Sequence, residues 1–135
     1  MFAPSFFTGF VITKFGNKNV MLVGVLLYLI SISFSIVGQT FLNFWISLFL
    51  CGLGWNLLYV GGSDIIAKSA SPEERPKVQG VTDFIIFTFV ATGSFLAGVL
   101  HTSLGWELMM IYTSVPIIIL FVSIFVIKPH KLSLR

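Results

Sequence analysis

The chain has 135 residues, of which 56% are hydrophobic and only 10% are charged. A soluble domain carries roughly 25% charged residues, so this composition excludes an ordinary soluble protein and indicates an integral membrane protein surrounded by lipid. The formal net charge of +3 does not point to nucleic acid. The basic residues lie in short segments between apolar runs, where they set orientation in the membrane.

Five apolar runs separated by polar segments predict an all-α, polytopic membrane helix bundle, with residues 1–135 as a single unit. As a helix, the first run covers about 18 Å of a hydrocarbon core about 30 Å thick, so we expect only a partial span there. The expected spans are 1–12 (partial), 20–37, 44–66, 80–102 and 107–127. The expected cytoplasmic segments are the loops 13–19 and 67–79 and the tail 128–135.

That orientation comes from the distribution of basic residues. All eight Lys and Arg residues fall in the loops 13–19 and 67–79 or in the tail. The two remaining turns carry none, and one of them holds Trp106, an aromatic residue typical of the membrane interface. By the positive-inside rule, both loops and the C-terminus are expected in the cytoplasm, and the first run starts on the outer side.

The loop between the third and fourth spans contains start and stop signals for helices. The sequence SPEE fits a capping box, with Ser71 as N-cap, Pro72 at the first helical position and Glu74 reaching back to the N-cap backbone. Pro76 limits that helix to about one turn, because its ring clashes with the carbonyl group four residues earlier. We therefore expect one short turn, and then a new helix that begins near Pro76.

Trp55, Asn56 and Tyr59 are candidates for lining a solute cavity. Asn56 lies near the middle of the third span, where an amide group needs a partner. Trp55 and Tyr59 are four residues apart and share one helical face. Together the three side chains are suited to bind a solute by hydrogen bonding and stacking. The alternative is helix packing, with Asn56 bonded to a neighbouring helix.

Two acids lie just inside apolar runs, Asp64 before the loop 67–79 and Asp83 after it. A charge so close to hydrocarbon is costly and needs a partner or a function. Both acids are within reach of the loop bases Lys68, Arg75 and Lys77. We interpret these five residues as a candidate cytoplasmic gate, with ion pairs that form in one transport state and break in the other. The alternative is static ion pairing at the interface.

No catalytic or metal-binding pattern is present in the sequence. The single cysteine, Cys51, and the two histidines, His101 and His130, have no neighbours at ligand spacing. There is no nucleophile elbow, phosphate-binding loop or dinucleotide fingerprint. We therefore expect no enzyme, no cofactor and no metal. Glycines within the spans, such as Gly54, predict close helix packing instead.

The first loop resembles a family signature. Residues 9–18 read GFVITKFGNK, which is similar to G-x-x-x-D-[RK]-x-G-[RK]-[RK], the loop signature of the major facilitator superfamily. Thr13 stands where an acid is usual, and Asn17 stands where a base is usual. The matching positions are Gly9, Lys14, Gly16 and Lys18. The segments GWNLLYVGGS and SPEERPKVQGVTDF also resemble the C-terminal half of bacterial members.

The resemblance implies a partial superfamily fold, the eighth to twelfth helices of a twelve-helix secondary transporter in a bacterial inner (cell) membrane. It further implies alternating access for a small solute of unknown identity, with lipid and a missing N-terminal half as partners. A register as helices two to six is the less favoured alternative, because the signature lacks its acid. For function, the alternative is a non-transporting membrane fragment that acts as an interaction or assembly partner.

Overall fold

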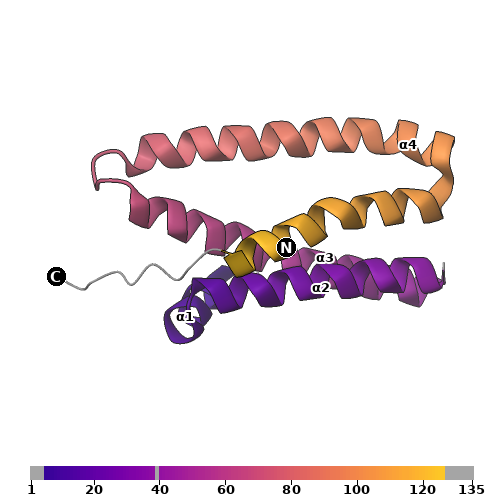
Figure 1. Cartoon of the computed structure of the whole chain (residues 1–135), viewed down its shortest axis with the longest axis horizontal. Helices are drawn as coiled ribbons and strands as arrows, with labels where there is room; N and C mark the ends of the chain where they lie inside the picture. Colours follow the sequence, from indigo (N-terminus) through magenta and orange to yellow (C-terminus); the bar gives the residue numbers. More distant parts are fainter. Residues whose placement is uncertain (1–4, 39, 127–135) are drawn as a thin grey trace.

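The structure is a computed structural model that describes residues 5–38 and 40–126. The described chain is α-helical apart from short turns and contains no strand, which confirms the all-α membrane helix bundle. The helices are α1 (Ser5–Phe15), α2 (Asn17–Val37), α3 (Phe41–Ser69) and α4 (Arg75–Val126) (Figure 1). The start of the expected partial span, residue 127 and the tail 128–135 lie outside the described residues.

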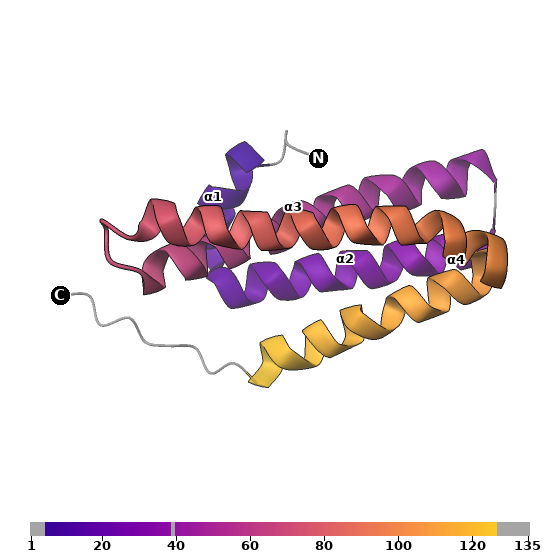
Figure 2. The ribbon, with the colours of Figure 1, turned by 90° about the horizontal axis from the view of Figure 1, so that it is seen from above.

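Helix α4 consists of two limbs that meet at Gly105. This glycine has φ 74° and ψ 171°, a backbone conformation that residues with a Cβ atom rarely adopt. The chain therefore reverses there, and the limb 106–126 runs back alongside the bundle, next to α2 in both views (Figures 1 and 2). At ~1.5 Å per residue the limbs are about 45 Å and 32 Å long, so each is long enough to cross a hydrocarbon core of about 30 Å.

Helices α2 and α3 form the most extensive contact of the bundle, and α4 packs mainly on α2. The closest approach is at Gly24 of α2 and Gly54 of α3. A Cβ atom added to Gly54 would lie 2.8 Å from the carbonyl oxygen of Gly24 and 2.9 Å from the ring of Tyr28. Glycine at this crossing thus lets the two backbones come close.

Most large apolar side chains point outward. Val25 is fully buried, whereas Phe84, Phe89 and Phe95 along the first limb of α4 are more than 70% exposed. Helices α2, α3 and α4 are also long and apolar enough to span a membrane by length and composition. An exposed apolar surface of this extent is suited to lipid or to further helices, as expected of an integral membrane protein.

The polar segments between helices are shorter than the expected loops. Helix α1 continues to Phe15 and α2 begins at Asn17, so the turn between them is Gly16 alone, with φ 80°. Helix α3 continues to Ser69, and α4 begins at Arg75, just before Pro76. The positions of the membrane boundaries remain a prediction.

The expected short turn forms at residues 71–74. The backbone N–H groups of Glu74 and Arg75 donate to the carbonyl oxygen of Ser71, at 3.0 and 3.1 Å. The side chains pair differently from a capping box, since the Ser71 hydroxyl donates to the Glu74 carboxylate at 2.6 Å. The turn brings these two side chains together. The Glu74 carboxylate, which in a capping box accepts a hydrogen bond from the backbone of the N-cap residue, here accepts one from the Ser71 hydroxyl.

Candidate functional site

Asn56 points from α3 toward α1 and is only 4% exposed. The Thr8 hydroxyl donates to Asn56 Oδ1 at 2.7 Å, and Asn56 Nδ2 donates to the Ser5 hydroxyl at 2.5 Å. These bonds give the amide partners on a neighbouring helix, the arrangement expected of a buried polar side chain within a membrane bundle. The structure therefore places Asn56 in the contact between α1 and α3.

Tyr59 faces α4 instead, and Trp55 stacks on Tyr59. Their rings stack with centroids 6.2 Å apart and planes at 12°, as the four-residue spacing predicts. Tyr59 also contacts Phe87 on the first limb of α4, with centroids 6.4 Å apart and planes at 52°. Both α3 rings are half-buried. The expected group of three is therefore divided, with its two aromatic members on one side of α3 and its amide on another.

Asp83 meets this aromatic pair from α4. The Tyr59 hydroxyl donates to Asp83 Oδ1 at 2.9 Å, and Gln79 Nε2 donates to the same oxygen at 3.0 Å. Gln79 also donates to the hydroxyl of Ser63 on α3, at 3.3 Å. Trp55, Tyr59, Ser63, Gln79 and Asp83 thus form one continuous cluster between the two helices, which we call the Asp83 cluster.

The loop bases do not reach Asp83 in this structure. Arg75 Nε donates to the carbonyl oxygen of Ala70 at 3.4 Å, and Lys77 is exposed. The helix geometry explains the choice of partner. Gln79 lies one turn before Asp83 on the same face of α4, whereas Lys77, six residues before Asp83, lies about 120° away around the helix.

Asp64 has the basic partner expected of it. Lys68 Nζ forms an ion pair with Asp64 Oδ2 at 2.5 Å, one helical turn along α3. Asn17 Nδ2, at the start of α2, donates to the same oxygen at 2.5 Å. Within the described residues, the buried Oδ1 of Asn17 has no hydrogen-bond partner. The acid therefore joins the turn at Gly16 to the end of α3.

The four matching positions of the loop signature have different environments. Gly16 forms the turn with its positive φ, whereas Gly9 lies within α1, and a Cβ atom there would meet nothing within 4 Å. Lys14 Nζ lies 5.5 Å from the centre of the Phe15 ring. Lys18 is half-buried in the first turn of α2. Only Gly16 is required by the backbone conformation of the turn.

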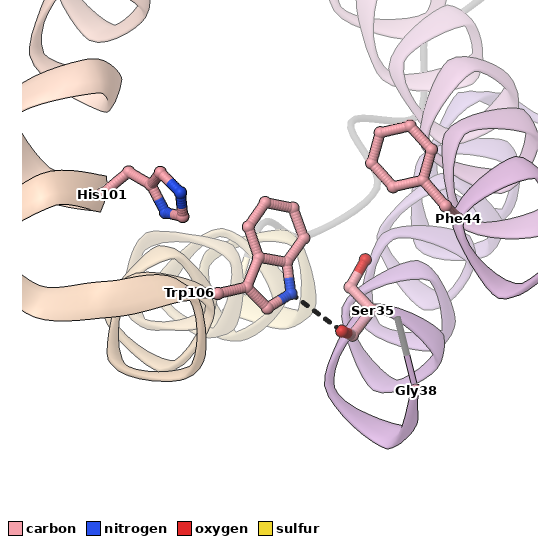
Figure 3. Close-up of a pocket in the computed structure, with 5 residues that line it drawn as sticks. All are labelled: Ser35, Gly38, Phe44, His101 and Trp106. Atoms are coloured by element: carbon pink, nitrogen blue, oxygen red, sulfur yellow. Dashed lines mark hydrogen bonds between the residues drawn. The ribbon is translucent and has the colours of Figure 1, made fainter. Parts of the chain in front are cut away.

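A pocket of about 260 Å³ lies at the opposite end of the bundle, lined by Ser35, Gly38, Phe44, His101 and Trp106 (Figure 3). The Trp106 indole N–H donates to the carbonyl oxygen of Ser35 at 2.9 Å. His101 meets the Trp106 ring edge-on at 5.9 Å. Within residues 5–38 and 40–126, His, Cys, Asp and Glu form no group able to hold a metal ion. Sequence reasoning missed this pocket, because one wall comes from α2, α3 and the turn between them and the other from α4, more than 50 residues later in the chain.

Comparison with known proteins agrees with this architecture. The family model of the Major Facilitator Superfamily matches residues 1–134. The chain is 43% identical over 107 residues to the riboflavin transporter RfnT of Brucella anthropi, covering 79% of this chain and 27% of that protein.

Two proteins of Bacillus subtilis are also similar, YdeG (30% over 102 residues) and YddS (33% over 107 residues), both described as uncharacterized MFS-type transporters. These matches cover 74% and 76% of this chain but 24% of each relative. The chain thus spans about a quarter of the length of its curated relatives. No solved structure matches it. On the match of the family model across nearly all of its residues, the chain belongs to the Major Facilitator Superfamily.

Proposed function

We propose that this chain forms the eighth to twelfth helices of a secondary transporter that moves a small solute across a bacterial cell membrane by alternating access. The match of the family model to residues 1–134, in a chain whose matched part covers about a quarter of each relative, carries this proposal. Helices α1, α2 and α3 are then the eighth to tenth, and the limbs of α4 are the eleventh and twelfth. An N-terminal half supplies the other wall of the solute pathway, since such transporters bind solute between two repeats.

The end of the bundle that carries Gly16 and the 71–74 turn is proposed to face the cytoplasm. There, the hydrogen bond from Asn17 to Asp64 holds the start of α2 against the end of α3, and Lys68 pairs with the same acid within α3. Asp83 binds α3 from the other side. Opening this end breaks such contacts, and the exposed Arg75 and Lys77 then take part in the other state. These residues form the proposed gate.

Riboflavin is the first solute to test, because the transporter that is 43% identical to this chain is named for it. The test is uptake of labelled riboflavin by bacterial cells that lack their own riboflavin transporter and express the full-length transporter, with this chain joined to its N-terminal half. Uptake is expected to exceed that of cells with an empty vector, and to fall when a protonophore removes the ion gradient. A protein that inserts at normal abundance, yet raises uptake of neither riboflavin nor any solute in a panel of vitamins and nucleosides, contradicts transport. That result favours the alternative role as a membrane interaction partner.

A further inference from the structure

We propose that Trp55, Tyr59 and Asp83 form a binding platform for a flat, conjugated heteroaromatic ligand with a ring N–H group. The inference rests on the proposed function, because it assigns the solute-contacting surface of this chain. It is narrower than that function in naming the class of ligand and the atom that selects it.

The stacked rings provide the flat surface. Trp55 and Tyr59 lie nearly parallel, at 12°, and both are half-buried rather than enclosed. Trp55 is the midpoint of α3, which spans Phe41–Ser69, so in a membrane it lies near the midplane, where secondary transporters bind solute. Offset stacking on such rings favours a ligand that is itself flat and conjugated. An aliphatic solute of the same size gains only the burial of its apolar surface.

The Asp83 carboxylate selects for a ligand with a ring N–H group. Tyr59 and Gln79 both donate to Oδ1 of Asp83, and these two bonds fix the orientation of the group. Within the described residues, Oδ2 accepts no hydrogen bond. An ionised carboxylate inside an apolar span needs a partner. A ligand N–H group is the donor that Oδ2 can accept from. The same negative charge disfavours an anionic ring.

A second aromatic pair on α3 has the same spacing as Trp55 and Tyr59 but, within the described residues, no acid bonded to it. Trp45 and Phe49 stack with centroids 5.8 Å apart and planes at 2°, again with a four-residue spacing. Phe49 has no hydroxyl group with which to hold a carboxylate, and both rings are more than half exposed. This outward-facing pair is a matched control, with similar ring geometry but without an oriented acceptor.

The experiment measures the affinity of the full protein, purified into lipid nanodiscs, for riboflavin and for 3-methylriboflavin. The second compound keeps the flat ring system but has no ring N–H group. Binding is followed through quenching of the ligand's own fluorescence. We expect wild-type protein to bind riboflavin at least about tenfold more tightly than the methylated compound, the effect of one hydrogen bond to a charged group. In the Asp83→Asn variant the carboxylate oxygen is replaced by an amide that donates, so we expect the two ligands to bind within about twofold of each other.

Substitution of the rings tests the stacking. Trp55→Leu is expected to weaken riboflavin binding about three- to tenfold, and Trp55→Phe, which keeps an aromatic face, to restore most of it. Trp45→Leu is expected to leave binding unchanged. Circular dichroism and elution volume establish that each variant is folded, and Trp55→Phe and Asp83→Asn preserve shape if Trp55→Leu does not fold.

Three results overturn the platform: equal affinity of wild-type protein for the two ligands, equal effects of Trp55→Leu and Trp45→Leu, or no binding of either flavin. Each leaves the proposed transport intact if cells still take up a solute. Conversely, binding with the expected pattern but without uptake of any solute keeps the platform and removes the transport function.

Discussion

Trp55 and Asn56 are neighbours in the sequence but belong to different helix contacts. Successive residues of an α-helix lie about 100° apart around its axis. The stack of Trp55 on Tyr59 toward α4 therefore directs Asn56 elsewhere, and its partners Ser5 and Thr8 are on α1. These hydrogen bonds favour the packing role that was the alternative for Asn56, and the aromatic pair stays a candidate for solute contact.

Replacement of Asn56 separates packing from solute binding. Asn56→Ala removes the hydrogen bonds to Ser5 and Thr8 from a buried contact, so we expect the free energy of unfolding to fall by about 1 kcal/mol. Riboflavin affinity is expected to stay within about twofold of wild type. Unfolding in mixed detergent micelles measures the first quantity, and ligand fluorescence measures the second.

The control is Ser33→Ala, because Ser33 is exposed and, among the residues that the structure describes, bonds only to the carbonyl oxygen of Leu29 on its own helix. It is expected to change neither quantity. Weaker binding by Asn56→Ala at unchanged stability contradicts the packing role.

Contacts within one helix followed from the sequence, and contacts between helices mostly did not. The stack of Trp55 on Tyr59 and the pair of Asp64 with Lys68 depend on a spacing of four residues, which is visible in the chain. The bond from Tyr59 to Asp83 depends on the relative position of α3 and α4. No spacing encodes that position.

At the scale of helices, the contact of α2 with α3 combines close backbones and hydroxyl groups. Gly24 and Gly54 mark the crossing. Toward the other end, Ser31 and Ser47 each donate to the carbonyl oxygen of the other, at 2.8 and 2.9 Å, and the Ser35 hydroxyl lies 2.5 Å from that of Ser47. Small residues and buried hydroxyls thus take the place of an apolar core, as expected where lipid removes the hydrophobic drive between helices.

The close crossing of α2 and α3 predicts that alanine substitution at two glycines of α3 has very different effects on the free energy of unfolding. In Gly54→Ala the new methyl group meets the backbone of Gly24, which cannot rotate away, so α2 and α3 must separate. We expect a loss of about 1–3 kcal/mol in the free energy of unfolding, as for overpacking of a core. In Gly62→Ala the methyl group meets nothing within 4 Å, and the variant is expected to be neutral or more stable by up to about 1 kcal/mol. Unfolding of both variants in the same micelles checks this, and an equal response contradicts the close crossing.

Helix boundaries were harder to predict than helices. The apolar runs indicated where helices lie, but the polar residues of 13–19 suggested a loop where the structure has one turn residue, Gly16. Polar residues continue a helix readily when it projects beyond the hydrocarbon, so polarity marks the membrane surface better than it marks a helix end. The reversal at Gly105 lies in the turn expected between the spans 80–102 and 107–127, and a glycine suits a turn with positive φ.

At the scale of the whole molecule, the two ends of the bundle differ in chemistry. One end has the turn at Gly16, the ion pair of Asp64 with Lys68 and the exposed bases Arg75 and Lys77. The other end has the uncharged turn after α2, the reversal at Gly105 and the pocket around Trp106 (Figures 1 and 3). The positive-inside rule predicts that the first end faces the cytoplasm, and the gate proposal depends on that prediction.

Thiol labelling of intact cells tests this orientation. The single native cysteine, Cys51, is first replaced by serine, and one new cysteine is then placed at each end through Glu73→Cys or Ser103→Cys. Both positions are exposed in the structure. We expect a membrane-impermeant maleimide to label the Ser103→Cys variant in intact cells, and the Glu73→Cys variant only after the cells are permeabilised. The protein without cysteine is the control and stays unlabelled. The reverse pattern would place the Asp64 ion pair on the outer side and make the proposed gate an external one, whereas the transport proposal and the Asp83 platform would stand.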